Sequence, residues 1–317
     1  LFTAAGRDHA GTVWFDDLGI DTAHEQPEAW LGGAATVAAP ARRHAQHKGS
    51  FGDVAVVGGA PGMVGAALLT GRAAAFLGAG RVLVGLLAAD ALAVDPQRPE
   101  LMFRNAHGLL AENAGAYAIG PGLGQSDAAR SITADALRLQ RPLVLDADAL
   151  NLVARHAELQ HALTARDAPT LLTPHPAEAA RLLARTTGDV QADRITAACT
   201  LAARLAAWVV LKGCGSIVAS PDGQYWINTS GTPAMATAGM GDVLTGLAVA
   251  LLARGWNARD TLLAAVHLHG LAGNRICIEQ GIDSGLLADE LAPIARRCFN
   301  EWIKRGIDRS VPTQEIS

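Results

Sequence analysis

The segment Gly239-Met-Gly-Asp242 has the clearest chemical potential in the sequence. It opens an apolar stretch that predicts a helix, so the backbone amides of Gly239, Met240 and Gly241 would converge at a helix N-terminus and form an anion hole. Asp242 falls in the first turn, where an acid also serves as a plain helix cap. A carboxylate beside an anion hole suits phosphoryl transfer to an alcohol. The amides would stabilise charge on the phosphoryl group while Asp242 accepts the hydroxyl proton.

A second glycine-rich segment, Lys212-Gly-Cys-Gly-Ser216, follows an apolar run. A lysine at the end of a strand can neutralise phosphate, and the amides around Gly213, Cys214, Gly215 and Ser216 can bind further oxygens. The alternative is a surface loop with a solvated lysine.

Two polar clusters follow other apolar runs. In Asp146-Ala-Asp-Ala-Leu-Asn151, Asp146 and Asp148 are placed to reach a ligand or a hydrated metal ion. In Thr173-Pro-His-Pro-Ala-Glu178, the two prolines present His175, which favours a ligand contact. Glu178 would act on Mg²⁺ through water, or it would only interact with the helix N-terminus.

Two further glycine-rich turns are less specific. Gly58–Gly65 leads into a helix at Ala66, but its glycines lack the GxGxxG spacing and no acid follows about twenty residues on, which argues against a dinucleotide fingerprint. The turn would bind phosphate or simply pack a strand against a helix. Gly120-Pro-Gly-Leu-Gly124 also permits a ligand to approach the backbone. His267 and His269 lie two apart in a predicted helix, so we expect them on different faces in packing roles.

All these segments follow short apolar runs that alternate with helical stretches. This alternation predicts an α/β fold with a doubly wound, mostly parallel sheet flanked by helices, and ligands bind outside the carboxyl ends of such strands. Pro221-Asp-Gly223 predicts a hairpin that adds an antiparallel edge. The predicted strands are 54–57, 81–84, 117–119, 143–145, 170–172, 209–211, 216–219 and 224–227, and the predicted helices include 65–77, 127–139, 150–163, 176–184 and 191–206.

Composition narrows the class of protein. The 317 residues are 50% hydrophobic and 18% charged, which supports a large core and excludes global disorder. A net charge of −4 argues against nucleic-acid partners and a polybasic membrane surface. The longest uncharged apolar run, 54–71, contains Pro61 and several glycines, so we expect no membrane span. Four cysteines without CxxC spacing favour reduced thiols in the cytoplasm.

With these motifs in order, the chain resembles the ADP/ATP-dependent NAD(P)H-hydrate dehydratases of the ribokinase-like superfamily. The resemblance covers about 47–291 and includes His47-Lys-Gly-Ser-Phe-Gly52, the turns at Gly58–Ala66 and Gly120–Gly124, and the segments at 146–151, 173–178, 212–216 and 231–246. Residues 1–30 resemble the end of an NAD(P)H-hydrate epimerase domain. The expected division is therefore an epimerase remnant at 1–30, a dehydratase domain at 31–310 and a tail at 311–317.

The resemblance implies a specific reaction. ADP, or ATP, would phosphorylate the ring hydroxyl of hydrated NADH or NADPH with Mg²⁺ present, and loss of phosphate would restore NAD(P)H and leave AMP. It implies that Ala66, Gly124, His175 and Asp242 contact the hydrated dinucleotide. It also implies that Lys212, Gly213, Cys214, Gly215, Ser216 and Gly241 hold the nucleotide, that Glu178 contacts Mg²⁺ indirectly, and that the enzyme is a homotetramer fused to an epimerase domain.

Two other functions fit some of the same residues. A ribokinase-like small-molecule kinase, such as a hydroxyethylthiazole kinase, would use the same anion hole and Asp242. The segments Gly120–Gly124 and Thr173–Glu178 favour the dehydratase. A non-catalytic nucleotide-binding module is disfavoured, because Asp242, the carboxylate that catalysis would need, is present directly after Gly239-Met-Gly241.

Overall fold

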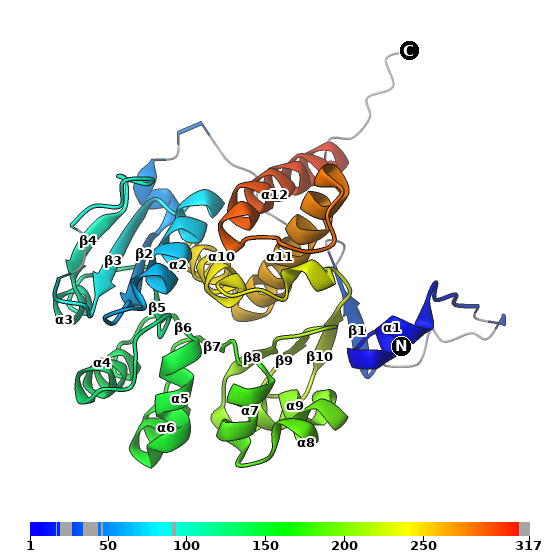
Figure 1. Ribbon diagram of the computed structural model, residues 1–317, viewed down its shortest axis with the longest axis horizontal. Helices are drawn as coiled ribbons and strands as arrows, with labels where there is room; N and C mark the ends of the chain where they lie inside the picture. Colours follow the sequence, from blue (N-terminus) through cyan, green and yellow to red (C-terminus); the bar gives the residue numbers. More distant parts are fainter. Residues whose placement is uncertain (17, 20–26, 34–43, 46, 91–92, 311–317) are drawn as a thin grey trace.

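A ten-stranded sheet forms the centre of the computed structural model, which describes residues 1–16, 18–19, 27–33, 44–45, 47–90 and 93–310. The strand order is β1-β10-β9-β8-β7-β6-β5-β2-β3-β4 (Figure 1). The strands are β1 Ala29–Gly32, β2 Asp53–Gly58, β3 Arg81–Leu86, β4 Met102–Asn105, β5 Ala116–Ile119, β6 Leu143–Leu145, β7 Thr170–Leu172, β8 Trp208–Leu211, β9 Ile217–Ala219 and β10 Tyr225–Asn228. All eight strands predicted from the sequence are present.

The sheet is parallel from β8 through to β4, and β9 runs antiparallel to both of its neighbours. The predicted doubly wound α/β fold is therefore confirmed, and so is the hairpin β9–β10. The hairpin is not the outermost element, however, because β1 pairs in parallel with β10. Trp30 of β1 stacks on Trp226 of β10 with ring centroids 5.1 Å apart, which fastens this outer strand.

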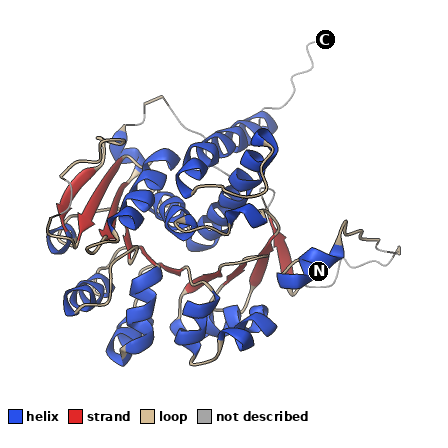
Figure 2. Ribbon diagram, in the orientation of Figure 1, coloured by secondary structure: helices blue, strands red, loops and turns tan. Residues whose placement is uncertain are grey.

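Helices cover both faces of the sheet (Figure 2). One face is covered by α2 Val64–Leu77, α10 Met240–Ala253, α11 Ala258–Gln280 and α12 Ala288–Ser310. The other is covered by α3 Ala106–Leu109, α4 Asp127–Leu137, α5 Ala147–Arg155, α6 Ala157–Thr164, α7 Pro176–Leu183, α8 Thr187–Ala192 and α9 Arg194–Leu205. Short 3₁₀ turns lie at Lys48–Phe51 and Pro233–Met235. Two predicted helices are each divided, at His156 and at Asp193.

Helix α10 is held in the centre of its layer. Most of its residues are buried, as expected for a helix that is apolar on every side. It crosses α2 closely at Gly246, where a Cβ atom would lie 2.3 Å from the Thr70 carbonyl oxygen. Only glycine fits there, so this contact fixes the position of the helix whose N-terminus carries Gly239–Asp242.

The N-terminal helix α1, Ala4–Ala10, lies beside the hairpin end of the sheet (Figure 1). The amide of Ala4 donates to the Cys214 carbonyl over 3.1 Å, and Arg7 Nη2 donates to the Thr229 carbonyl over 2.6 Å. The division at residues 30 and 31 stays a prediction, and the tail 311–317 lies outside the described residues. Within the described ranges, no helix is both long enough and apolar enough to cross a membrane.

Candidate active site

The chemically promising segments follow neighbouring parallel strands. Asp146 follows β6, Thr173 follows β7 and Lys212 follows β8, so these residues meet at one edge of the sheet. Asp146 and Lys212 line a cavity of about 870 Å³, a volume in the usual range for small-molecule sites. The N-terminus of α10 also borders the cavity, since Gly239, Met240, Gly241 and Asp242 are among its lining residues.

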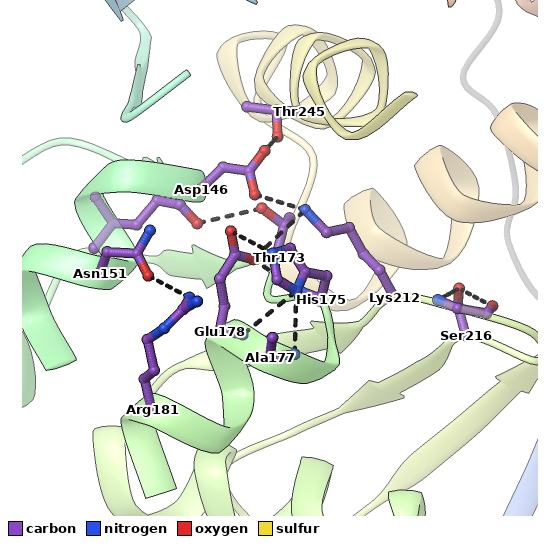
Figure 3. A network of polar contacts seen from close by, with 12 residues as sticks. Asp146, Asn151, Thr173, His175, Ala177, Glu178, Arg181, Lys212, Ser216 and Thr245 are labelled. Carbon is purple, nitrogen blue, oxygen red and sulfur yellow. Dashed lines mark hydrogen bonds and ion pairs between the residues drawn. The ribbon is translucent and has the colours of Figure 1, made fainter. Parts of the chain in front are cut away.

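A buried ion pair lies at the floor of this cavity. Lys212 Nζ is 2.8 Å from Asp146 Oδ1, and the other carboxylate oxygen accepts a hydrogen bond from Thr245 Oγ1 over 2.8 Å (Figure 3). Burial alone would lower the pKa of Lys212, but Asp146 and Glu178 outweigh it and raise the pKa above its ordinary value. Lys212 is therefore a fixed positive charge and not a solvated surface lysine.

Asp242 has a strongly perturbed carboxyl group. Burial, and then the negative charge of Asp146, raise the pKa of Asp242 to about 7, although Lys212 opposes the shift. A carboxyl with this pKa exchanges its proton near neutral pH, as a general base requires. Asp242 also lies in the first turn of α10, where it interacts favourably with the helix dipole, although no side chain caps this N-terminus.

The residues predicted to form an anion hole, Gly239, Met240 and Gly241, lie at the start of α10 and line the cavity. Gly239 has a left-handed backbone, with φ of 87°, and ends the loop before the first turn. Gly241 faces the ammonium closely, since a Cβ atom on it would lie 3.1 Å from Lys212 Nζ. The helix dipole and the lysine thus attract an anion to the same place.

His175 and Glu178 form a capping box at the start of α7. The amide of Ala177 donates to His175 Nδ1 over 3.1 Å, and the amide of His175 donates to Glu178 Oε2 over 2.8 Å. His175 Nε2 lies 3.2 Å from Glu178 Oε1 (Figure 3). Burial and then Lys212 lower the pKa of His175, so the ring is neutral and its Nε2 carries the proton. Both side chains line the cavity.

Glu178 suits an indirect metal contact. Burial raises the pKa of its carboxyl, and Lys212 partly offsets this shift. Glu178 Oε2 is 4.0 Å from Lys212 Nζ. Both Glu178 oxygens already contact His175, so a bridging water fits this carboxylate better than direct coordination. Among the described residues, no group of three or more His, Cys, Asp or Glu side chains is arranged to hold a metal ion. Mg²⁺ commonly binds through substrate phosphates and waters rather than an all-protein cage.

The segment Lys212–Ser216 forms a tight turn at the cavity rim. The amide of Gly213 donates to Ser216 Oγ over 3.2 Å, and this hydroxyl donates back to the Gly213 carbonyl over 3.0 Å. Lys212, Gly213, Cys214 and Ser216 line the cavity. Gly215 instead lies under the N-terminal segment, where a Cβ atom would be 2.1 Å from the Phe2 carbonyl oxygen.

Ala66, near the start of α2, and Gly124, in the turn after β5, lie outside the cavity lining. The amide of Ala60 donates to the Gly122 carbonyl over 2.6 Å, which joins the turn before Ala66 to the turn that ends at Gly124. The amide of Gly124 donates to Asp148 Oδ2 over 2.8 Å. Asp148 lies on α5, directly beyond Asp146, so these turns continue the edge of the sheet that bears the cavity.

Several residues at the site were not predicted from the sequence. Thr245 lies one helical turn beyond Asp242, a spacing that places both on one face of α10. His269 lines the cavity although we expected a packing role for it. Arg7 and Asp8 of α1 also line the cavity, which no local pattern in the sequence indicates.

Known proteins show close similarity to this chain. A family model described as NAD(P)H-hydrate dehydratase matches residues 54–297. The chain is 44% identical over 277 residues to an ADP-dependent (S)-NAD(P)H-hydrate dehydratase of Neisseria meningitidis, which covers 86% of this chain and 91% of that protein. The solved structure of an ADP/ATP-dependent NAD(P)H-hydrate dehydratase from Bacillus subtilis, co-crystallised with ATP and Mg²⁺, has a TM-score of 0.74 and 31% identity. It covers 84% of this chain and 95% of that one.

The chain is also similar to part of a longer, bifunctional relative. The chain is 34% identical over 319 residues to the bifunctional NAD(P)H-hydrate repair enzyme of Escherichia coli. The alignment covers 95% of this chain and 58% of that protein. The chain therefore spans little more than half of this bifunctional relative.

Proposed function

The chain belongs to the NAD(P)H-hydrate dehydratase family, and we propose that its cavity removes water from hydrated NADH or NADPH with ADP as the phosphoryl donor. The enzyme is thus a hydro-lyase that repairs a damaged cofactor. The proposal depends above all on the surroundings of Asp242. Its raised pKa and its place beside the amides of α10 suit proton removal from an alcohol. A kinase for an unrelated alcohol would use the same residues, but the family match favours the hydrate.

The first step transfers a phosphoryl group to the ring hydroxyl of the hydrated nicotinamide. Asp242 accepts the hydroxyl proton as the oxygen bonds to the terminal phosphorus of ADP, and the bond from that phosphorus to the bridging oxygen breaks to release AMP. The amides of Gly239, Met240 and Gly241 stabilise charge on the phosphoryl group during transfer. Lys212, held by Asp146, adds a fixed positive charge beside Gly241.

The second step breaks the carbon–oxygen bond of the ring. Phosphate leaves far more readily than hydroxide, and loss of a proton from the neighbouring carbon restores the double bond of NAD(P)H. The neutral ring of His175 lines the cavity with Lys212, and it would contact the hydrated ring without adding a charge. Ala66 and Gly124 would contact the rest of the dinucleotide along the adjoining turns.

The nucleotide would lie against the Lys212–Ser216 turn and the α10 N-terminus. Mg²⁺ would be bound by its phosphates and, through water, by Glu178, and would neutralise phosphate charge there. The relatives' names support ADP as donor, and the ATP-bound structure supports a site that accepts either nucleotide.

The longer relatives support a place for this chain in a larger enzyme. We propose that it functions beside an NAD(P)H-hydrate epimerase domain, as in the bifunctional relatives. We further propose a homotetramer working in the cytoplasm, where the free thiols of Cys199, Cys214, Cys277 and Cys298 would stay reduced.

Recovery of NADH absorbance tests the proposed function. The chain is incubated with hydrated NADH, Mg²⁺ and either ADP or ATP, and NADH is expected to return together with AMP when ADP is the donor. A reaction lacking nucleotide is the control for spontaneous dehydration. No return of NADH with either nucleotide would exclude the dehydratase activity.

A further inference from the structure

Helix α1 lies at the rim of the cavity, although it is far in sequence from the residues of the proposed active site. Three of its residues, Ala4, Arg7 and Asp8, line the cavity. The whole helix precedes residue 54, where the match to the dehydratase family begins. Membership of the family therefore assigns no role to α1.

The start of α1 is joined to the Lys212–Ser216 turn. The amide of Ala4 donates to the Cys214 carbonyl over 3.1 Å, and Cys214 Sγ donates to the Ala4 carbonyl over 3.6 Å. Gly215 lies so near the same segment that a Cβ atom on it would be 2.1 Å from the Phe2 carbonyl oxygen. The chain around Ala4 thus packs directly against the turn that is proposed to hold the nucleotide.

Arg7 joins α1 to a second segment of the rim, the loop that follows β10. Its Nη2 donates to the carbonyl oxygen of Thr229 over 2.6 Å and to that of Gly231 over 3.3 Å. Hydrogen bonds from a charged guanidinium are stronger than those between neutral groups. Arg7 therefore holds the helix against this loop as well as against the turn.

The two segments that α1 joins belong to different parts of the site. The 212–216 turn follows β8, whereas the loop after β10 leads to the N-terminus of α10. A helix that is bonded to both segments restricts how far they can move apart. In the proposed function ADP binds against the same turn and the same helix N-terminus, so bound ADP and docked α1 favour one arrangement of the rim.

The folding of α1 depends on this docking. The helix has only seven residues, and none of these seven is buried. An isolated helix of this length is not stable in water, because too few hydrogen bonds form to offset the cost of its first turn. When the bonds to the rim break, the helix is therefore expected to unfold, and its amides then exchange with solvent.

We propose that α1 is part of the nucleotide site and that Arg7 is a positioning residue: it keeps α1 docked across the rim, and docking of α1 and binding of ADP strengthen each other. The proposal rests on the proposed function for the identity of the nucleotide. Such coupling is reciprocal, so the factor by which docking tightens ADP binding equals the factor by which ADP favours docking.

Hydrogen exchange of the amides of residues 4–10 measures the docking in the full chain. Saturating ADP with Mg²⁺ is expected to slow this exchange about fivefold in the wild type. In Arg7→Ala without ADP, the same amides are expected to exchange about tenfold faster than in the wild type, because the bonds to the two carbonyls are lost. The Kd for ADP, measured by calorimetry, is expected to rise in this variant by about the same fivefold factor, while kcat changes little.

His9→Gln is the matched control on the same helix. The side chain of His9 is exposed and lies outside the cavity lining, so this variant is expected to leave the exchange, the Kd and kcat unchanged.

Two results would overturn the proposal. If Arg7 only attracted the phosphates by its charge, Arg7→Ala would weaken ADP binding and leave the exchange without ADP unchanged, which would overturn the positioning role. Exchange in the wild type that bound ADP does not slow would overturn the coupling. Neither measurement needs turnover, so ADP binding with slowed exchange but without recovery of NADH would contradict the proposed function and leave the role of α1 intact.

Discussion

Lys212 Nζ lies 2.8 Å from Asp146 Oδ1, although 66 residues separate them in the sequence. The pair joins the ends of β8 and β6 across β7, and Thr245 of α10 binds the second oxygen of the same carboxylate. The ammonium group of Lys212, which would contact the nucleotide, is thus held in position through Asp146 by residues of the sheet edge and of α10, the helix that carries Asp242.

Removing one member of this pair is expected to destabilise the fold. Lys212→Met leaves the buried Asp146 carboxylate unpaired, which lowers the free energy of unfolding by about 3 kcal/mol. Urea denaturation followed by circular dichroism measures the change. The double variant Asp146→Leu with Lys212→Met is expected to regain part of the loss, because the buried carboxylate of Asp146 is then absent while that of Glu178 remains. Equal stability of Lys212→Met and wild type would contradict the pairing.

Asp242→Asn tests the proton acceptor. Asparagine keeps the shape of the side chain but cannot accept the hydroxyl proton, so kcat is expected to fall by a factor of about 10³. ADP binding measured by calorimetry should survive, since the amides and Lys212 remain. Turnover within tenfold of wild type would remove Asp242 from this role.

The pH dependence of turnover follows from the pKa of Asp242, which is about 7. The carboxyl must be deprotonated to act as a base, so kcat is expected to rise tenfold per pH unit below about pH 7 and to level off above it. The groups that set this pKa are Asp146, Lys212, Glu178 and Asp148, in that order after burial. A flat profile between pH 5.5 and 8 would contradict the assignment.

The same shift makes stability depend on pH. The folded pKa of Asp242 lies above its unfolded value of 3.8, so the native state holds this proton more tightly than the unfolded chain. The contribution of this proton to the free energy of unfolding is fully present below about pH 4 and is lost as the pH rises through 7. Asp242→Asn lacks this loss, so its Tm relative to wild type is expected to increase from pH 5 to pH 8. An equal Tm difference at both pH values would contradict a buried, titrating Asp242.

Sequence reasoning found the parts of the site that lie within single segments. The segments at Lys212 and at Gly239–Asp242 could be predicted because glycine and charge occur together at strand or helix ends. Thr245 and His269 could not, since their places at the site depend on how α10 and α11 pack. Strands β1 and β4 were missed for a related reason. Both are edge strands and most of their residues are not buried. β4 includes Arg104 and Asn105 and so lacks a continuous apolar run. β1 is apolar but only four residues long, and its partner β10 lies far away in the sequence.

Gly239→Ala is expected to disrupt the anion hole. Gly239 has φ of 87°, and a Cβ atom would lie 2.7 Å from Leu69 Cδ1 and 3.0 Å from Ala288 Cβ. The loop must therefore shift, and kcat is expected to fall by about 10². Gly255→Ala is the matched control, because Gly255 has φ of 83° with no atom within 4 Å of the added Cβ. It should lower stability by about 1 kcal/mol and leave kcat unchanged. A kcat for Gly239→Ala equal to that of Gly255→Ala would contradict a role of Gly239 in the anion hole.

The N-terminal segment is expected to contribute to nucleotide affinity. Ala4, Arg7 and Asp8 line the cavity, and the guanidinium of Arg7 bonds to the Thr229 and Gly231 carbonyls at its rim. Arg7→Ala removes these bonds and a positive charge that lines the cavity, so the Kd for ADP should rise about fivefold, with little change in kcat. Arg185→Ala is the control, because this exposed arginine lies outside the cavity lining and should leave the Kd unchanged. Removal of a side chain that contacts the nucleotide should weaken ADP binding. Tighter ADP binding in Arg7→Ala would therefore contradict this prediction and would mean that the N-terminal segment occupies part of the space that ADP needs.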